Sequence, residues 1–408
     1  MSLLKKIYFD HAATTKLDSK VLDKMIPYLK NKYGNASSLY DLGQESREAI
    51  EKARKGLADI LKCSPEEIIF TSGGSESDSL AIVGYALANK SKGNHIITSK
   101  FEHPAVLEAC KFLKTQDFEI TYVPITKQGI VNVEKLKESI TDKTILISIM
   151  HANNEIGTIQ PIKKIYDICK KESEKQNRKI AFHTDAVQTF GKIEIDSSMA
   201  DMISISAHKF YGPKGIGLLY KKTGISIKPL IHGHQEKNMR GGTYNTANIV
   251  GMAEAAKIAE EIKEKTNKKL RNLTDKLIKG VLNIENTWIN GIGNNIGENK
   301  LPGLVNLGFL LIEGESILMH LDNKGIMCST GSACSSDSLQ PSHVLLSLGL
   351  KHEEAHGSLR ISLGKENTEE EIDYFLTILP EIIEKLRKMS PFKNKAQLKS
   401  FKGNSTCD

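Results

Sequence analysis

The sequence predicts an α/β protein in which a large domain, with a mainly parallel central sheet flanked by helices, joins a smaller α+β domain. Three observations favour this fold. The chain of 408 residues exceeds the usual size of one compact core. Strand-like and helical segments alternate up to about residue 260, which is typical of a parallel sheet, and the pattern then changes. We expect a large domain at 15–260, a small domain made of 1–14 and 261–390, and a basic C-terminal tail at 391–408.

The alternation can be followed along the large domain. Arg47–Leu61 carries apolar residues at helical spacing, which predicts a helix. A second helix is expected at Ser75–Ala88, and Pro104 stands where proline is tolerated, in the first turn of a third. Short apolar runs bounded by turn residues predict the strands. These runs are Ile68–Phe70, His95–Ile97, Ile120–Val123, Ile145–Met150, Ile180–His183, Met202–Ser206 and Gly217–Tyr220.

The pattern of apolar and charged residues changes in the last third of the chain. A long charged helix is expected at about Met252–Lys279, followed by mixed strands and helices and a final helix at Glu369–Lys388. The longest apolar runs, such as Thr144–Met150 and Leu304–Ile312, are far shorter than the roughly 18 residues that cross a bilayer. The N-terminus has a basic pair but no apolar stretch after it, so we expect a cytoplasmic protein without membrane contacts.

Charge and cysteine usage restrict the possible partners. The formal charge of +7 is modest, and 39% hydrophobic with 26% charged residues is ordinary for a globular protein. Lysines crowd the tail beyond Pro391 without regularly alternating aromatics, which predicts a solvated segment or a docking surface for an acidic partner, and no nucleic-acid binding. Six scattered cysteines without a CxxC pair argue against disulfides and structural zinc, and favour a reducing compartment.

Two motifs resemble known sites but lack the necessary context. His352–His356 matches the zinc-protease pattern HExxH, yet Gly349 and Gly357 bracket it. Too little helix remains to place both imidazoles on one face, so we expect a short surface helix and no metal. The glycine clusters at 212–217 and 291–293 do not complete GxGxxG, and no GxxxxGK[ST] occurs. A dinucleotide site or a P-loop is therefore unsupported.

Three segments carry residues suited to one chemistry. Phe70–Ser77 reads as a strand, a two-glycine turn and a helix start, whose free N–H groups suit a phosphate. Asp185 ends a buried strand, where it is either a helix N-cap or the partner of a protonated ring nitrogen. Lys209 follows the next strand and is either solvent-exposed or a nucleophilic amine made neutral by desolvation. Together, a phosphate cradle, an acid and an amine are what pyridoxal 5'-phosphate (PLP) requires.

Further short motifs follow the same order along the chain as in a known family. They are Asp10-His-Ala-Ala-Thr-Thr15, Thr71-Ser-Gly-Gly-Ser-Glu-Ser77, Glu102-His103, His151-Ala-Asn-Asn-Glu-Ile-Gly157, Asp185…Gln188, Ser206-Ala-His-Lys209, Met239-Arg-Gly-Gly-Thr243, Gly331-Ser-Ala-Cys334 and Arg360-Ile-Ser-Leu-Gly364. With these motifs the chain resembles cysteine desulfurases of the NifS/IscS type, in the class V aminotransferase superfamily of PLP fold type I. The resemblance implies conversion of L-cysteine to L-alanine. Sulfur would pass through an enzyme persulfide to an acceptor protein for iron–sulfur cluster assembly or tRNA thiolation.

The resemblance also implies how the ring of PLP is held. Lys209 would bond to the cofactor aldehyde and move the substrate's α-proton, while Asp185 would face the pyridine nitrogen. Such a pair gains roughly 4 kcal/mol gross at an effective dielectric of about 20, or about three pKa units, which keeps the ring protonated. Gln188 would bind the ring hydroxyl. His103 would stack on the ring and assist proton transfer, although by itself it could equally be a structural histidine.

Phosphate and substrate contacts follow from the same resemblance. Thr243 would reach the phosphate from the neighbouring subunit, which implies a homodimer. Arg360 would clamp the substrate carboxylate through its planar fork, with Asn154 beside it at the cofactor; the alternative for Arg360 is a surface ion pair. The remaining phosphate contacts would come from Gly74, Ser75, Ser206 and His208.

Cys334 lies in a run of small polar residues, which predicts an accessible loop and therefore a reactive thiol. Cys328, six residues earlier, is unusual for the family, and we expect it to be buried rather than to act as a resolving thiol. Ala36 replaces a proline that the family commonly has. Two alternatives stay open: a selenocysteine lyase or PLP aminotransferase, and a catalytically silent scaffold of an iron–sulfur assembly complex. An aminotransferase would have no use for Cys334.

Overall fold

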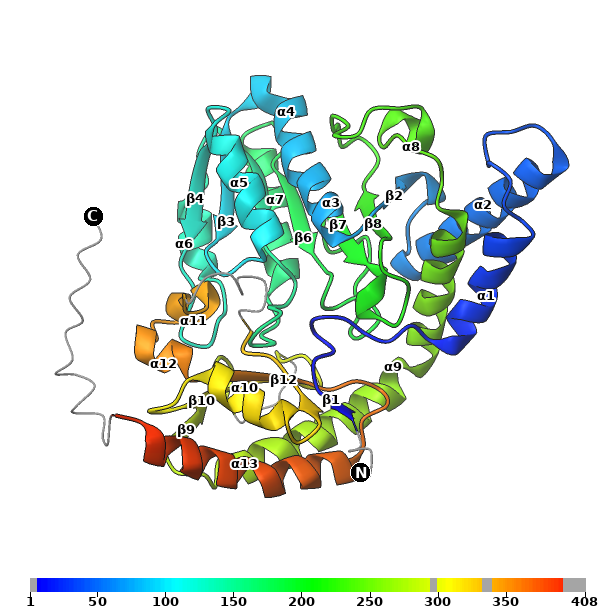
Figure 1. The fold of residues 1–408 in the computed structure, drawn as a ribbon. Helices are drawn as coiled ribbons and strands as arrows, with labels where there is room; N and C mark the ends of the chain where they lie inside the picture. The colour runs from blue at the N-terminus through cyan, green and yellow to red at the C-terminus, as the bar shows by residue number, and fades with distance from the viewer. Residues whose placement is uncertain (1–5, 294–298, 332–339, 392–408) are drawn as a thin grey trace.

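A seven-stranded sheet forms the centre of the larger part of the molecule (Figure 1). The computed structural model describes residues 6–293, 299–331 and 340–391. Strand β8 runs antiparallel to both of its neighbours, and the other four pairings are parallel, so the predicted mainly parallel sheet is confirmed. The strands, in spatial order, are β2 (Ile68–Thr71), β8 (Gly217–Lys221), β7 (Met202–Ser206), β6 (Ala181–Asp185), β5 (Thr144–Ser148), β3 (His95–Ser99) and β4 (Glu119–Val123).

Helices cover both faces of the sheet because successive strand residues point to opposite sides. Ile96 and Leu146 pack in one apolar cluster, whereas Ile97 and Ile147 pack in another. The first cluster is covered by η2 (Leu80–Gly84), α4 (Tyr85–Asn89) and α5 (Pro104–Lys114). The second is covered by α1 (Ser19–Lys30), α2 (Asp41–Leu61), α6 (Val133–Glu138), α7 (Ile162–Lys175) and the first half of α9 (Thr246–Val281).

The helix predicted at Ser75–Ala88 is not continuous. Helix α3 (Gly74–Ser79) passes into the π-helical η2 before α4 begins. The backbone around Lys228 packs against this stretch: its N–H donates to the Gly84 carbonyl at 2.9 Å. A Cβ on Gly84 would lie 2.7 Å from the Lys228 carbonyl oxygen, so only glycine allows the contact. A tertiary contact of this kind leaves no mark on the local periodicity.

A separate apolar cluster forms the smaller part, in the lower half of Figure 1. An antiparallel sheet joins β12 (Ser358–Ser362), β10 (Leu304–Phe309) and β9 (Thr287–Ile289). A parallel pair joins β1 (Ile7–Tyr8) to β11 (Ile326–Met327). The helices of this cluster are α10 (Gly314–Asp322), α13 (Glu369–Met389) and the second half of α9.

Helix α9 contributes to both parts. Its first half, with Met252, packs in a cluster of the central sheet, and its second half, with Leu277, packs in the cluster of the smaller part. The helix is longer than the predicted Met252–Lys279, and the predicted domain boundary at residue 260 falls inside it. The division into domains therefore stays a prediction. Within the described ranges, no helix combines the length and apolarity needed to cross a membrane.

Candidate active site

A cavity of about 410 Å³ lies where β6 and β7 end, beside the start of α3. In α/β sheets, ligands gather at these carboxyl ends of parallel strands. Of the predicted site residues that the structure describes, the cavity brings together all except Thr243: Gly74, Ser75, His103, Asn154, Asp185, Gln188, Ser206, His208, Lys209 and Arg360. These residues lie far apart in the sequence, so the fold and not local proximity creates the site.

The turn between β2 and α3 forms one wall of the cavity. A Cβ on Gly74 would lie 2.7 Å from Val187 Cγ2, so any other residue at the start of this helix would force Val187 to shift. The first N–H groups of a helix lack partners within it and favour an anion. Ser75, Ser206 and His208 add side chains that can bind an oxyanion. This wall could therefore hold a phosphate.

Asp185 lies on the cavity floor at the end of β6, 6% exposed. The backbone N–H of Val187 donates to its Oδ1 at 2.8 Å. Burial raises the pKa of its carboxyl to about 6, while that hydrogen bond and the charge of Lys209 act in the opposite direction. A cation bound in the cavity would therefore stabilise the ionised form of the Asp185 carboxyl.

Two more buried acids, Asp78 and Glu102, lie near Asp185, and neither is among the predicted site residues. Asp78 lines the same cavity, and its Oδ1 has no hydrogen-bond partner. Burial, reinforced by the charge of Asp185, raises the pKa of Asp78 well above its usual value. Glu102 accepts hydrogen bonds from Ser99 at 2.6 Å and from the Met150 N–H at 2.9 Å, and burial raises its pKa to about 8.

Lys209 reaches the cavity from η4 (Ala207–Lys209), the single turn that follows β7. Its Nζ donates to the carbonyl oxygens of Ala12 at 2.6 Å and Ala13 at 2.8 Å. Gln188 Nε2 also donates to the Ala12 carbonyl, at 3.0 Å. The N-terminal segment is therefore a wall of the site and holds the amine inside the cavity.

His103 is the N-cap of α5, and its Nδ1 accepts the Ala105 N–H at 3.1 Å. That bond leaves the proton of a neutral ring on Nε2. Burial, reinforced by the positive charges of Lys209 and His343, lowers the pKa of His103 to about 4. The ring is therefore neutral near pH 7, with one N–H available to the cavity.

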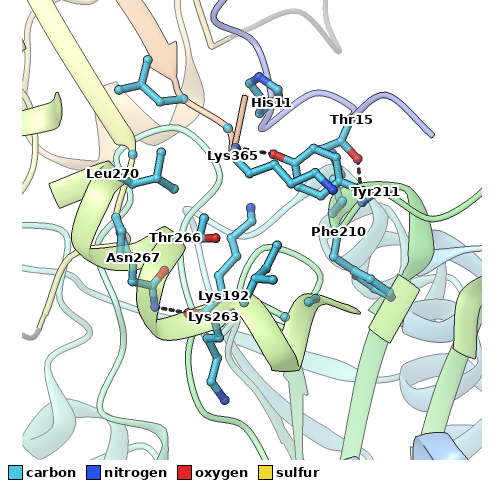
Figure 2. A pocket seen from close by; sticks show the side chains of 18 of the residues that line it. His11, Thr15, Lys192, Phe210, Tyr211, Lys263, Thr266, Asn267, Leu270 and Lys365 are labelled. Atoms are coloured by element: carbon cyan, nitrogen blue, oxygen red, sulfur yellow. Dashed lines mark hydrogen bonds between the residues drawn. The ribbon is translucent and has the colours of Figure 1, made fainter. Parts of the chain in front are cut away.

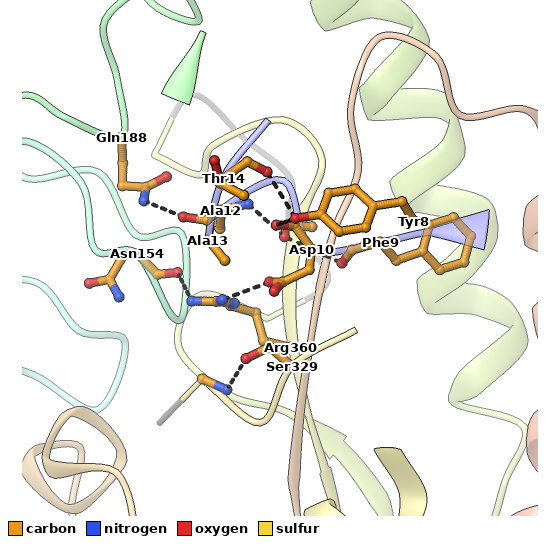
Figure 3. A network of polar contacts seen from close by, with 12 residues as sticks. Tyr8, Phe9, Asp10, Ala12, Ala13, Thr14, Asn154, Gln188, Ser329 and Arg360 are labelled. Atoms are coloured by element: carbon orange, nitrogen blue, oxygen red, sulfur yellow. Dashed lines mark hydrogen bonds and ion pairs between the residues drawn. The ribbon is translucent and has the colours of Figure 1, made fainter. Parts of the chain in front are cut away.

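Arg360, on β12, projects from the smaller part into the cavity and is 3% exposed (Figure 3). Its Nη2 pairs with Asp10 Oδ1 at 2.8 Å, and its Nη1 donates to the Asn154 backbone oxygen at 3.1 Å. Its Nε has no partner. The guanidinium is thus fixed in place by two contacts and keeps donor capacity for a carboxylate.

Two predicted site residues remain, of which one lies outside the described residues and the other lines a different hollow. Cys334 lies outside the described residues, although Gly331, three positions earlier, lines the cavity. Thr243 lines a different hollow, together with Phe70 and Arg240. Cys328 is buried, as predicted, and burial raises the pKa of its thiol to about 12.

A second cavity lies against α9 and is also lined by Lys192, Phe210 and Tyr211 (Figure 2). It encloses only about 50 Å³, whereas sites for small molecules usually span roughly 300–1,000 Å³. Lys192 extends into it, and burial together with the charges of Lys209 and Arg360 lowers the pKa of Lys192 to about 7. The first cavity is therefore the candidate site.

The segment that matches the HExxH pattern forms α12 (His352–His356), a helix of five residues in which both histidines are exposed.

Comparisons with known proteins agree on one family. The family model described as "Aminotransferase class-V" matches residues 7–375. A relative from Clostridium botulinum named "Cysteine desulfurase IscS" is 51% identical over 95% of this chain and 96% of its own. One of the same name from Methanosarcina thermophila is 50% identical over 96% and 95%.

Solved structures give the same result. A chain titled "NIFS-LIKE PROTEIN" has a TM-score of 0.86 and 40% identity, covering 93% of this chain and all of its own. One titled "SspA in complex with cysteine" has a TM-score of 0.75 and 36% identity, covering 89% of this chain and all of its own.

Proposed function

Since the chain belongs to the class-V aminotransferase family, among its cysteine desulfurases of the NifS/IscS type, we propose that it takes sulfur from L-cysteine. In the proposed reaction, L-cysteine and the Cys334 thiol give L-alanine and a Cys334 persulfide. The carbon–sulfur bond of the substrate breaks, and a sulfur–sulfur bond forms on the enzyme. The observation that supports this most strongly is that Lys209, Asp185 and Arg360 line one cavity.

The cavity fits PLP. A protonated ring nitrogen would place a cation beside the buried Asp185 and stabilise its ionised form. The turn at Gly74, with Ser75, would hold the phosphate, and Gln188 the ring hydroxyl. When bound, PLP supplies an aldehyde that bonds to amines and a ring that accepts electrons from the substrate.

The protein side chains would supply positioning and proton transfer. Lys209 would remove the α-proton of the substrate, because its Nζ is held inside the cavity by the Ala12 and Ala13 carbonyls. His103, neutral and with its Nε2 proton facing the cavity, would pack on the ring and relay a proton. Arg360 would bind the substrate carboxylate, and its bond to Asp10 would fix the orientation of the fork.

The proposed partners extend beyond the substrate. A persulfide needs an acceptor protein, in iron–sulfur cluster assembly or tRNA thiolation. Thr243 lies away from the cavity of its own chain, which supports the proposal that it binds the phosphate of a neighbouring subunit. We therefore expect sedimentation equilibrium of the purified protein to give the mass of two chains. A monomer that keeps its cofactor and full turnover would contradict the homodimer.

The function is tested with purified protein, PLP and L-cysteine. With a thiol reductant present, sulfide and alanine are expected in equal amounts. Without the reductant, mass spectrometry is expected to find one added sulfur atom on the peptide that contains Cys334. Amino-group transfer to a keto acid without sulfide release would identify an aminotransferase instead. Turnover of L-selenocysteine but not L-cysteine would identify a selenocysteine lyase.

A further inference from the structure

One buried carboxylate contacts both described flanks of the segment that contains Cys334. Ser342 Oγ, on the C-terminal flank, donates to Glu155 Oε2 at 2.5 Å. Gly331, on the N-terminal flank, packs against the same oxygen: a Cβ there would lie 2.9 Å from Glu155 Oε2. Gly331 also has φ +89°, which disfavours any other residue. The two flanks thus meet at one point.

Glu155 is built into the site and does not point to solvent. It is 3% exposed, and its N–H donates to Asn153 Oδ1 at 2.8 Å. It directly follows Asn154, whose carbonyl accepts from Arg360. Burial raises the pKa of Glu155, while the Ser342 hydrogen bond and the nearby His343 and Arg360 lower it. A hydrogen bond to a buried carboxylate is among the stronger contacts in proteins.

Each flank also has a second attachment close to the cavity. On the C-terminal side, His343 Nε2 lies 2.9 Å from the backbone oxygen of Glu102, the residue before His103. On the N-terminal side, the Arg360 N–H donates to the Ser329 carbonyl at 2.6 Å. The attachments therefore connect one flank to the residue before His103 and the other to Arg360, and His103 and Arg360 both line the cavity.

We propose that Glu155 is a positioning residue that holds both flanks of the Cys334 segment against the cavity, so that the thiol reaches the substrate sulfur. This inference rests on the proposed function. Glu155 acts through the chain and does not itself contact the substrate.

The test is a single turnover of the PLP-loaded enzyme with L-cysteine, in which persulfide on Cys334 is followed by mass spectrometry. Glu155→Ala and Ser342→Ala are each expected to slow persulfide formation by roughly ten- to a hundredfold, because misplaced reacting groups lose that much. The double variant is expected to be no slower than Glu155→Ala alone, because the hydrogen bond between Ser342 and Glu155 is already lost in that variant. Glu155→Gln keeps an acceptor oxygen and is expected to recover the rate.

A second readout separates positioning from general damage. The visible spectrum of the bound cofactor, and the cysteine concentration needed to change it, are expected to stay as in the unaltered protein. Ser347→Ala is the matched control, because Ser347 Oγ bonds only within α11 (His343–Ser347), to the His343 carbonyl at 2.7 Å. Unchanged persulfide rates in both alanine variants, or no recovery in Glu155→Gln, would overturn the inference. If the unaltered protein forms no persulfide, the proposed function fails instead.

Discussion

Lys209→Ala is expected to lower alanine production by at least about a thousandfold, because the change removes both the covalent attachment of PLP and the group that moves the α-proton. The visible absorbance of the attached cofactor should disappear with it. The measurement is an absorbance spectrum together with alanine released per protein chain. Borohydride reduction followed by mass spectrometry should place the cofactor on residue 209 of the unaltered protein and nowhere on the variant.

Lys214→Ala provides the matched control, because Lys214 lies five positions later and its side chain is exposed. This variant should keep both the colour and the turnover. If Lys209→Ala kept the absorbance and full activity, the assignment of the cofactor site would be wrong.

Cys334→Ser is expected to bind PLP and L-cysteine normally and yet to release sulfide only at background level. A hydroxyl cannot form a persulfide. The described residues that line the cofactor cavity are unchanged in this variant, so binding should be retained. Binding is followed by the spectral change on adding cysteine, and turnover by sulfide released in the presence of a reductant.

Cys328→Ser is the control for Cys334→Ser, because it removes a different thiol, six positions earlier in the chain. Cys328 is buried with a raised pKa, so its replacement should cost stability through a buried hydroxyl and leave turnover per folded molecule unchanged. Normal sulfide release by Cys334→Ser would remove the persulfide on Cys334 from the proposal.

Much of the fold could be predicted because its strands are short, apolar and separated by turn residues. The predicted strand Met202–Ser206 matches β7 at both ends, and the predicted helix Glu369–Lys388 is one residue short of α13. The interruption of Ser75–Ala88 by η2 was missed, because its contact with residue 228 is tertiary. Periodicity reports which face of an element is buried, and it does not report what packs there.

The site was predicted from motifs, and the structure shows what the motifs omit. The hypothesis of a PLP site requires Lys209 and Asp185 to line one cavity, and in the structure they do. Asp78 was missed, although it stands three residues after Ser75 on the same helical face, and that spacing was the available signal. The ion pair of Arg360 with Asp10 could not be inferred, because nothing in either motif relates positions so far apart.

The separation between these two charged residues has a consequence for biosynthesis. Asp10 and Arg360 are 350 positions apart, and the amine of Lys209 depends on carbonyls from the first strand region. When only the central sheet has left the ribosome, the pocket therefore still lacks the guanidinium of Arg360. The substrate carboxylate would find its guanidinium only after translation has passed β12. Chains truncated before that point should lack this contact to the substrate, however well their sheet has formed.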